Sequence, residues 1–127
     1  MIGRGVVAAM IRNGLYAVTS RLLDGLEGGA TGVSVLQDGL MRGGGSIYYH
    51  TGTYSCSDGK WKGQITTREH KPELITQLFA RKVVTMGFTG TYTDEGAEFE
   101  ATALVGKRSA RLHVIFQLLI AEGDEAF

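Results

Sequence analysis

The chain has 127 residues, one cysteine, and 13 basic residues that balance 13 acidic ones. This length suits a single domain with an ordinary core. The balanced charge gives no electrostatic reason to expect a nucleic-acid partner. Cys56 has no partner for an internal disulfide, which favours a reducing, cytoplasmic location. No apolar run approaches the roughly 20 residues that span a bilayer as a helix, so no membrane association is expected.

Residues 1–12 are expected to form a frayed leader, because their short apolar run ends at Arg12 and Asn13. A single β-barrel domain is expected over residues 13–121, followed by a loose tail at 122–127. The first two strands are expected at residues 14–20 and 31–36. Asp38-Gly39 then predicts a hairpin turn, because both residue types tolerate the positive φ that a tight primed turn requires.

The third strand is expected to start at Leu40, to break at the glycines of residues 43–45 and to resume at Ser46. A fourth strand is expected at residues 52–55, and Asp58-Gly59 predicts a second hairpin turn. In the fifth strand, at residues 61–68, Trp61 and Ile65 share one face by the two-residue period.

Residues 72–80 break the strand pattern and predict one short helix or a loop, either as a lid or as filling for one end of the core. Three more strands are expected at residues 83–93, 98–104 and 111–121. In the last strand, alternation from Leu112 to Ile120 predicts one apolar face. About eight short strands without a long helix predict an all-β fold, an antiparallel up-and-down barrel.

An eight-stranded barrel has room either for a filled core or for one small ligand. Six large apolar residues are expected to face the interior and to bind an apolar ligand if the interior is open: Tyr54, Trp61, Ile65, Phe88, Phe99 and Phe116. The sequence leaves both possibilities open.

No catalytic residue, metal site or cofactor is expected. His50, His70 and His113 lie far apart without metal-ligand spacing, so they are expected at the surface or rim. Cys56 has no neighbouring base and is expected to be an ordinary thiol. The chain is therefore not expected to be an enzyme.

Two surfaces are candidates for protein contact. Tyr48, Tyr49, Ser57 and Asp58 are expected to bind a partner, although the tyrosines suit a pocket mouth or simple barrel packing equally well. Ile115 and Leu119 stand on the otherwise polar face of the last strand. Either residues 73–79 or a second copy of the chain would cover them, and the commonness of two-fold dimers favours a homodimer.

Several short motifs resemble the GrlR-type negative regulators of type III secretion, over about Met10 to Leu119. The resemblance rests on these segments: residues 13–16 (NGLY), 32–36 (GVSVL), 43–44 (GG), 46–49 (SIYY), 52–54 (GTY) and 88–91 (FTGT). It implies a bacterial, lipocalin-like barrel of eight strands, usually dimeric, that binds a transcriptional activator protein and not DNA.

The chain departs from the family pattern at two places. Gly45 stands where the glycine pair is often followed by aspartate, and only Asp58 is acidic where the founding regulators carry an acidic cluster for partner contact. The resemblance therefore predicts the fold more firmly than the partner. The expected function is non-enzymatic regulation through protein–protein interaction. The alternative is a carrier or sensor that holds a small apolar ligand inside the barrel.

Overall fold

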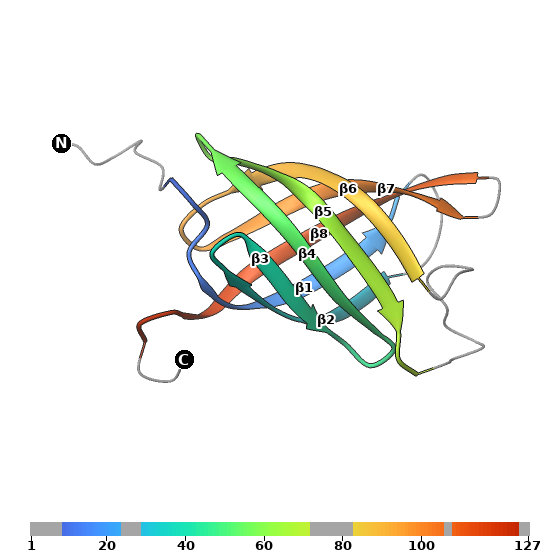
Figure 1. The fold of residues 1–127 in the computed structure, drawn as a ribbon, viewed down its shortest axis with the longest axis horizontal. Coiled ribbons are helices and arrows are strands. Elements are labelled where there is room, and N and C mark those ends of the chain that lie inside the picture. Colours follow the sequence, from blue (N-terminus) through green and yellow to red (C-terminus); the bar gives the residue numbers. More distant parts are fainter. Residues whose placement is uncertain (1–8, 24–28, 72–82, 106–107, 125–127) are drawn as a thin grey trace.

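Eight antiparallel strands follow one another around a closed barrel (Figure 1). The computed structural model describes residues 9–23, 29–71, 83–105 and 108–124. The strands are β1 (Gly14–Leu22), β2 (Gly29–Gln37), β3 (Leu40–Gly44), β4 (Tyr48–Ser57), β5 (Lys60–Glu69), β6 (Val83–Tyr92), β7 (Gly96–Val105) and β8 (Arg108–Ala121). Pairing of β1 with both β2 and β8 closes the barrel. The predicted all-β, up-and-down barrel is confirmed, with a shape that is compatible with a lipocalin-like fold, whereas the helix or loop expected near 72–80 lies outside the described residues.

Both Asp-Gly pairs form the predicted hairpin turns. Asp38 and Asp58 each have a φ of 51°, and Gly39 and Gly59 follow with φ values of 85° and 79°. Two successive residues with positive φ are typical of the primed turns whose twist matches that of paired strands. These turns connect β2 to β3 and β4 to β5.

The glycine-rich segment after β3 is a turn, and the prediction of one strand that resumes at Ser46 is wrong. β3 ends at Gly44, and the Gly45 amide donates a hydrogen bond to the Tyr48 carbonyl at 2.8 Å. A Cβ on Gly44 would lie only 2.8 Å from the Tyr49 Cα, so this tight return requires glycine. β4 consequently starts at Tyr48, four residues before the expected fourth strand.

A β-bulge in β8 reverses the alternation near the end of the chain. Tyr16 pairs with Leu118, but Leu15 pairs with Ile120, so Leu119 is an additional residue. Paired residues share a face of the sheet, which places Ile120 beside Leu15 on the outside. The prediction that Ile120 continues the inward face is therefore wrong.

One half of the barrel is filled by an aromatic cluster. Trp61 is 2% exposed, and its ring lies edge-on to four other rings with centroid distances of 4.9–5.7 Å: Tyr54, Phe88, Phe99 and Phe116. The indole Nε1 donates a hydrogen bond to the Glu98 carbonyl at 3.0 Å. Edge-to-face packing of this kind is favourable and leaves no space for a ligand.

Chain segments at both ends of the sequence seal this half, which we call the closed end (left in Figure 1). Ile11 is 2% exposed, and the Tyr16 hydroxyl donates to the Arg12 carbonyl at 2.7 Å. The packed core therefore extends upstream of the domain start expected at residue 13. The Glu122 amide donates to the Asn13 carbonyl at 2.8 Å, so the first residues of the expected tail are held against the barrel. No helix in the described part of the chain has the length and apolar character that crossing a bilayer requires.

Candidate functional site

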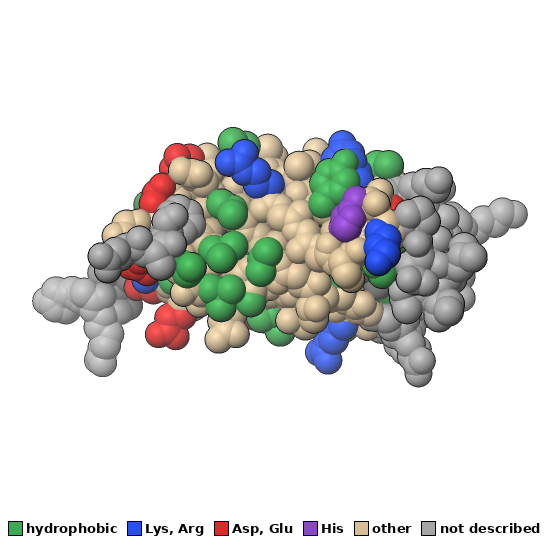
Figure 2. Space-filling view, turned by 90° about the horizontal axis from the view of Figure 1, so that it is seen from below, with side chains coloured by type: hydrophobic (Ala, Val, Ile, Leu, Met, Phe, Trp, Pro, Cys, Tyr) green, Lys and Arg blue, Asp and Glu red, His purple; other side chains and the backbone are tan. Residues whose placement is uncertain are grey.

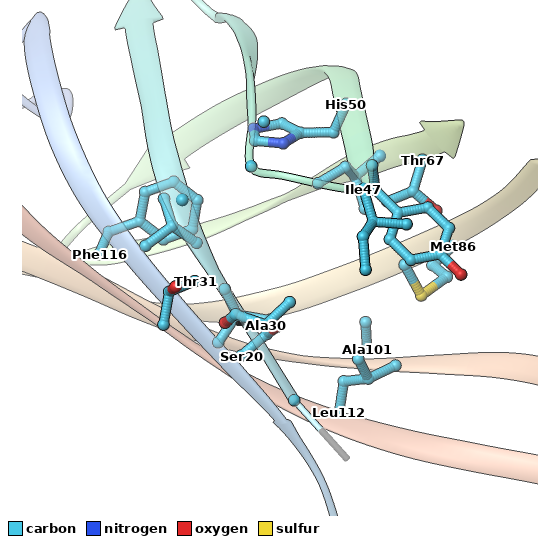
Figure 3. Close-up of a pocket in the computed structure, with 18 of the residues that line it drawn as sticks. Ser20, Ala30, Thr31, Ile47, His50, Thr67, Met86, Ala101, Leu112 and Phe116 are labelled. Atoms are coloured by element: carbon cyan, nitrogen blue, oxygen red, sulfur yellow. Dashed lines mark hydrogen bonds between the residues drawn. The ribbon is translucent and has the colours of Figure 1, made fainter. Parts of the chain in front are cut away.

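The half of the barrel opposite the closed end contains a cavity of about 310 Å³ (Figure 3). Its volume lies at the small end of the range of ~300–1,000 Å³ that is typical of sites for small molecules. Inward-facing apolar side chains from β1, β5, β6, β7 and β8 form one part of the wall: Val18, Ile65, Met86, Phe99, Ala101, Leu112, Val114 and Phe116. The start of β2 and the segment that joins β3 to β4 form another part, and five hydroxyl-bearing residues lie in the wall: Ser20, Thr31, Ser46, Tyr48 and Thr67. The cavity is thus a concave apolar site inside a preformed barrel.

The six residues expected in the interior divide between the two halves. Ile65, Phe99 and Phe116 line the cavity. Tyr54, Trp61 and Phe88 are also buried, but they lie in the aromatic cluster and form no part of the cavity wall. The sequence left open whether the interior is filled or has room for a ligand. In the described structure, one half of the barrel is packed and the other half contains the cavity.

His50 lies in the cavity wall, next to Ile47 and across from Ala101 and Leu112 (Figure 3). Its Nε2 is 2.8 Å from the Ser34 Oγ. The strand register explains how Ser34 of β2 and His50 of β4 meet, because each of them pairs with Gly43 of β3, which lies between them. Gly43 has no side chain between them, so the imidazole reaches over β3 to the serine.

Burial lowers the pKa of His50 from 6.5 to about 4. The imidazole is therefore neutral at physiological pH. Among the described residues that line the cavity there is no Asp, Glu, Lys or Arg. The described part of the cavity wall is consequently mostly apolar and uncharged, with a neutral imidazole in it.

The prediction that His50 is a surface or rim histidine is wrong. The signal that locates it is its spacing from Tyr54, since residues four apart on one strand share a face, and Tyr54 was expected inside. Ser34 carries the same signal, two residues before the fully buried Leu36. Sequence reasoning also did not assign several small or aliphatic wall residues to a ligand, among them Val18, Met86, Ala101, Leu112 and Val114.

The 2.8 Å contact between Ser34 and His50 has the distance of a nucleophile and its base, but the burial of Ser34 argues against that role. Ser34 is 0% exposed and does not line the cavity, so a substrate carbonyl has no path to its hydroxyl. Nucleophilic catalysis also needs donors for the developing oxyanion near the attacked atom. Within the described ranges, no group of three or more His, Cys, Asp or Glu residues is arranged to hold a metal ion.

The other chemistry-bearing residues lie away from the cavity. His70 is exposed and contacts the Gly45 carbonyl at 2.8 Å. His113 Nε2 lies 3.2 Å from Glu98 Oε2 on the outer surface, as expected for a solvated strand face. Burial raises the pKa of the Cys56 thiol, which disfavours the reactive thiolate. Burial also raises the pKa of Tyr54, whose hydroxyl is buried without a hydrogen-bond partner among the described residues.

The four residues expected to bind a protein partner do not form one surface. Tyr48 lines the cavity, whereas Tyr49 faces outward, is 42% exposed, and has its ring centroid 6.3 Å from that of His70. Ser57 and Asp58 lie at the other end of β4, in the turn to β5. The length of β4 separates the tyrosines from this turn.

Hydrophobic side chains also gather on the outside of the barrel (Figure 2). We call the following set, from the adjacent strands β8, β1, β2 and β3, the outer apolar face: Leu15, Ala17, Val33, Val35, Leu40, Ile115, Leu119 and Ile120. Leu15 pairs with both Val35 and Ile120, so the set is continuous across strands. Val33, Leu40, Ile115 and Leu119 are 45–58% exposed. Ile115 and Leu119 thus lie outside as predicted, within a larger apolar surface.

Comparison with known proteins does not assign the chain to a family. A scan against models of protein families finds no match. A search of curated proteins finds no relative with significant similarity. A function for this protein therefore has to follow from the cavity and the outer apolar face.

Proposed function

We propose that this protein is a non-enzymatic binding protein that holds one small apolar molecule inside its barrel. The observation that carries the proposal is the cavity of about 310 Å³ with its apolar wall. Protein interiors are normally packed to crystal-like density, so an apolar space of this size is costly when empty. A bound molecule that buries apolar surface there offsets the cost.

The two halves of the interior support the same function. Trp61 and the rings around it provide a packed floor, because their edge-to-face contacts fill this half of the barrel. Phe99 and Phe116 belong to both the cluster and the cavity wall, so they couple this floor to the site. A rigid floor below an open cavity is a preformed site, which lowers the entropic cost of binding.

A neutral fluorescent probe tests this proposal. We expect N-phenylnaphthylamine to bind the purified protein with a rise in fluorescence. Ala30→Phe should weaken binding about tenfold or more, since a phenyl ring would occupy space that the probe needs. Ala30 lines the cavity but is itself exposed, so this substitution does not disturb the packed half. The measurement is a fluorescence titration.

Thr91→Phe is the matched control, because Thr91 is exposed on β6 and lies outside the cavity. It should bind the probe with wild-type affinity. If wild-type protein gives no saturable signal, or if Ala30→Phe binds as tightly as Thr91→Phe, the cavity is not a binding site.

The outer apolar face favours a second candidate function, regulation through protein–protein contact. A closed barrel has no free strand edge for pairing with another chain, so a partner has to use a face. Large contiguous apolar patches on soluble proteins commonly mark such interfaces. The resemblance to GrlR-type regulators implies both a dimer and an activator as partner. A two-fold related copy brings the same apolar residues from both chains together, so we assign this face to a homodimer.

The dimer is tested by light scattering across a dilution series. We expect wild-type protein to have a dimer mass at micromolar concentration. Ile115→Lys should weaken the dimer roughly a hundredfold or more, because an unpaired ammonium group would be buried at the interface. Val83→Lys is the control, since Val83 is 53% exposed on β6, outside the outer apolar face. A monomer mass for the wild type would contradict the proposed dimer. If Ile115→Lys and Val83→Lys dissociated equally, the interface would not be the outer apolar face.

A further inference from the structure

The described cavity wall disfavours charged ligands. Every described residue in the wall is uncharged, including His50 in its neutral form. A carboxylate or an ammonium group that entered would lose its hydration without gaining a counter-charge. This loss costs several kcal/mol per ion, more than the burial of a few methylene groups recovers. The site therefore favours a neutral molecule.

The hydrogen bond between Ser34 and His50 fixes the tautomer of the imidazole. Ser34 is fully buried, and its hydroxyl has no other side-chain hydrogen bond among the described residues. If Nε2 were the donor, the serine hydrogen would remain buried without an acceptor, at a cost of about 1–3 kcal/mol. The serine therefore donates to Nε2, and the imidazole proton is on Nδ1.

Nδ1 of His50 is available to a ligand. The contact with Ser34 is the hydrogen bond that His50 makes within the described chain, and it uses Nε2. Among the described residues, the Tyr54 hydroxyl is the buried side-chain nitrogen or oxygen atom that lacks a hydrogen-bond partner. Nδ1 of His50 also lacks a partner among these residues but does not belong to this buried set, so it is accessible. The accessible space beside His50 is the cavity (Figure 3).

Two of the hydroxyl groups in the described wall, those of Ser20 and Thr67, are directed at backbone carbonyls. The Thr67 Oγ1 donates to the Val84 carbonyl, and the Ser20 Oγ donates to the Ala30 carbonyl, each at 3.4 Å. Both groups are thus directed at backbone. Opposite His50, Ala101 and Leu112 offer only hydrocarbon (Figure 3).

The geometry points to a specific ligand class: a neutral molecule with an apolar body and a carbonyl or similar acceptor that receives a hydrogen bond from the Nδ1–H of His50. This inference rests on the proposed function, and it adds the polarity and orientation of the ligand. The acceptor lies against β4, while the apolar body extends over Leu112, Met86 and Phe116.

Three probes of similar shape test the inference by displacement of N-phenylnaphthylamine. Methyl nonyl ketone has the acceptor, the corresponding alkene has a methylene group in place of the carbonyl oxygen, and decanoate has a charged head. Wild-type protein should bind the ketone about five- to tenfold more tightly than the alkene, the factor that one net hydrogen bond provides. Decanoate at neutral pH should bind more weakly than the ketone. In His50→Leu, the preference for the ketone should be lost or reversed, because the ketone oxygen would leave water without gaining a new donor. The alkene should bind at least as tightly as in the wild type.

His50→Gln is the conservative variant, because its amide retains a donor, and it should keep part of the preference for the ketone. Equal binding of ketone and alkene to wild-type protein would overturn the inference without any variant. A preference that survives in His50→Leu, or tightest binding of decanoate, would also overturn it. In these cases the probes still bind, so the proposed function stands. If no neutral probe binds, the proposed function fails and the inference fails with it.

Discussion

Trp61→Ala is expected to destabilise the protein by about 3–5 kcal/mol, the usual cost of truncating a fully buried aromatic residue. The indole is 2% exposed and contacts four rings of the closed end. Its removal would leave a second void next to the existing cavity, since Phe99 and Phe116 separate the two spaces. It would also remove the hydrogen bond to the Glu98 carbonyl. Urea unfolding followed by circular dichroism measures the change.

Tyr49→Ala is the matched control for this experiment. Tyr49 is also aromatic and in a strand, but it faces outward and is 42% exposed. Its truncation should cost less than about 1 kcal/mol, as is typical of surface positions. If Trp61→Ala cost no more than Tyr49→Ala, the closed end would not be a packed floor.

The second large effect is a loss of stability at acidic pH that depends on His50. In the unfolded chain this imidazole titrates near pH 6.5, but in the folded protein its pKa is about 4 because of burial. As the pH falls from 6.5 towards 4, the unfolded state gains a proton that the folded state does not, so the free energy of unfolding decreases. Below about pH 4 both states are protonated and this contribution changes no further.

We expect wild-type protein to lose roughly 2–3 kcal/mol more than His50→Gln between about pH 7 and pH 4.5, as obtained from urea unfolding at both values. The comparison cancels the titration of the carboxylates, which the two proteins share. His70→Gln removes a histidine outside the cavity and should retain the wild-type loss. If wild type and His50→Gln lost equal stability, the buried, neutral state of His50 would be contradicted.

The fold was largely predictable because its signals are local. The Asp38-Gly39 and Asp58-Gly59 turns and the alternation around Trp61 each depend on neighbouring residues, and the structure confirms them. The turn at residues 45–47 was missed because glycine permits both a kinked strand and a tight return. The bulge at Leu119 was missed because its apolar neighbours continue the alternation in sequence, and only pairing with β1 shows the extra residue.

The site was less predictable, because it depends on which residues meet across strands. In β4, both faces carry aromatic and polar side chains, so composition does not show that His50 points inward. Its contact with Ser34 requires the register of three strands and a glycine at position 43. The separation of a packed half from an open half likewise follows from packing in three dimensions. The large aromatic residues alone predicted an interior, but not its division.

We expect the apolar molecule to bind inside the barrel and not on its outer apolar face. Nuclear Overhauser contacts between N-phenylnaphthylamine and the methyl groups of labelled protein test this directly. The expected contacts are to methyl groups of the cavity wall: Val18, Ile65, Met86, Leu112 and Val114. Contacts confined to Val33, Leu40, Ile115 and Leu119 would place the molecule on the outer apolar face and contradict a binding site inside the barrel.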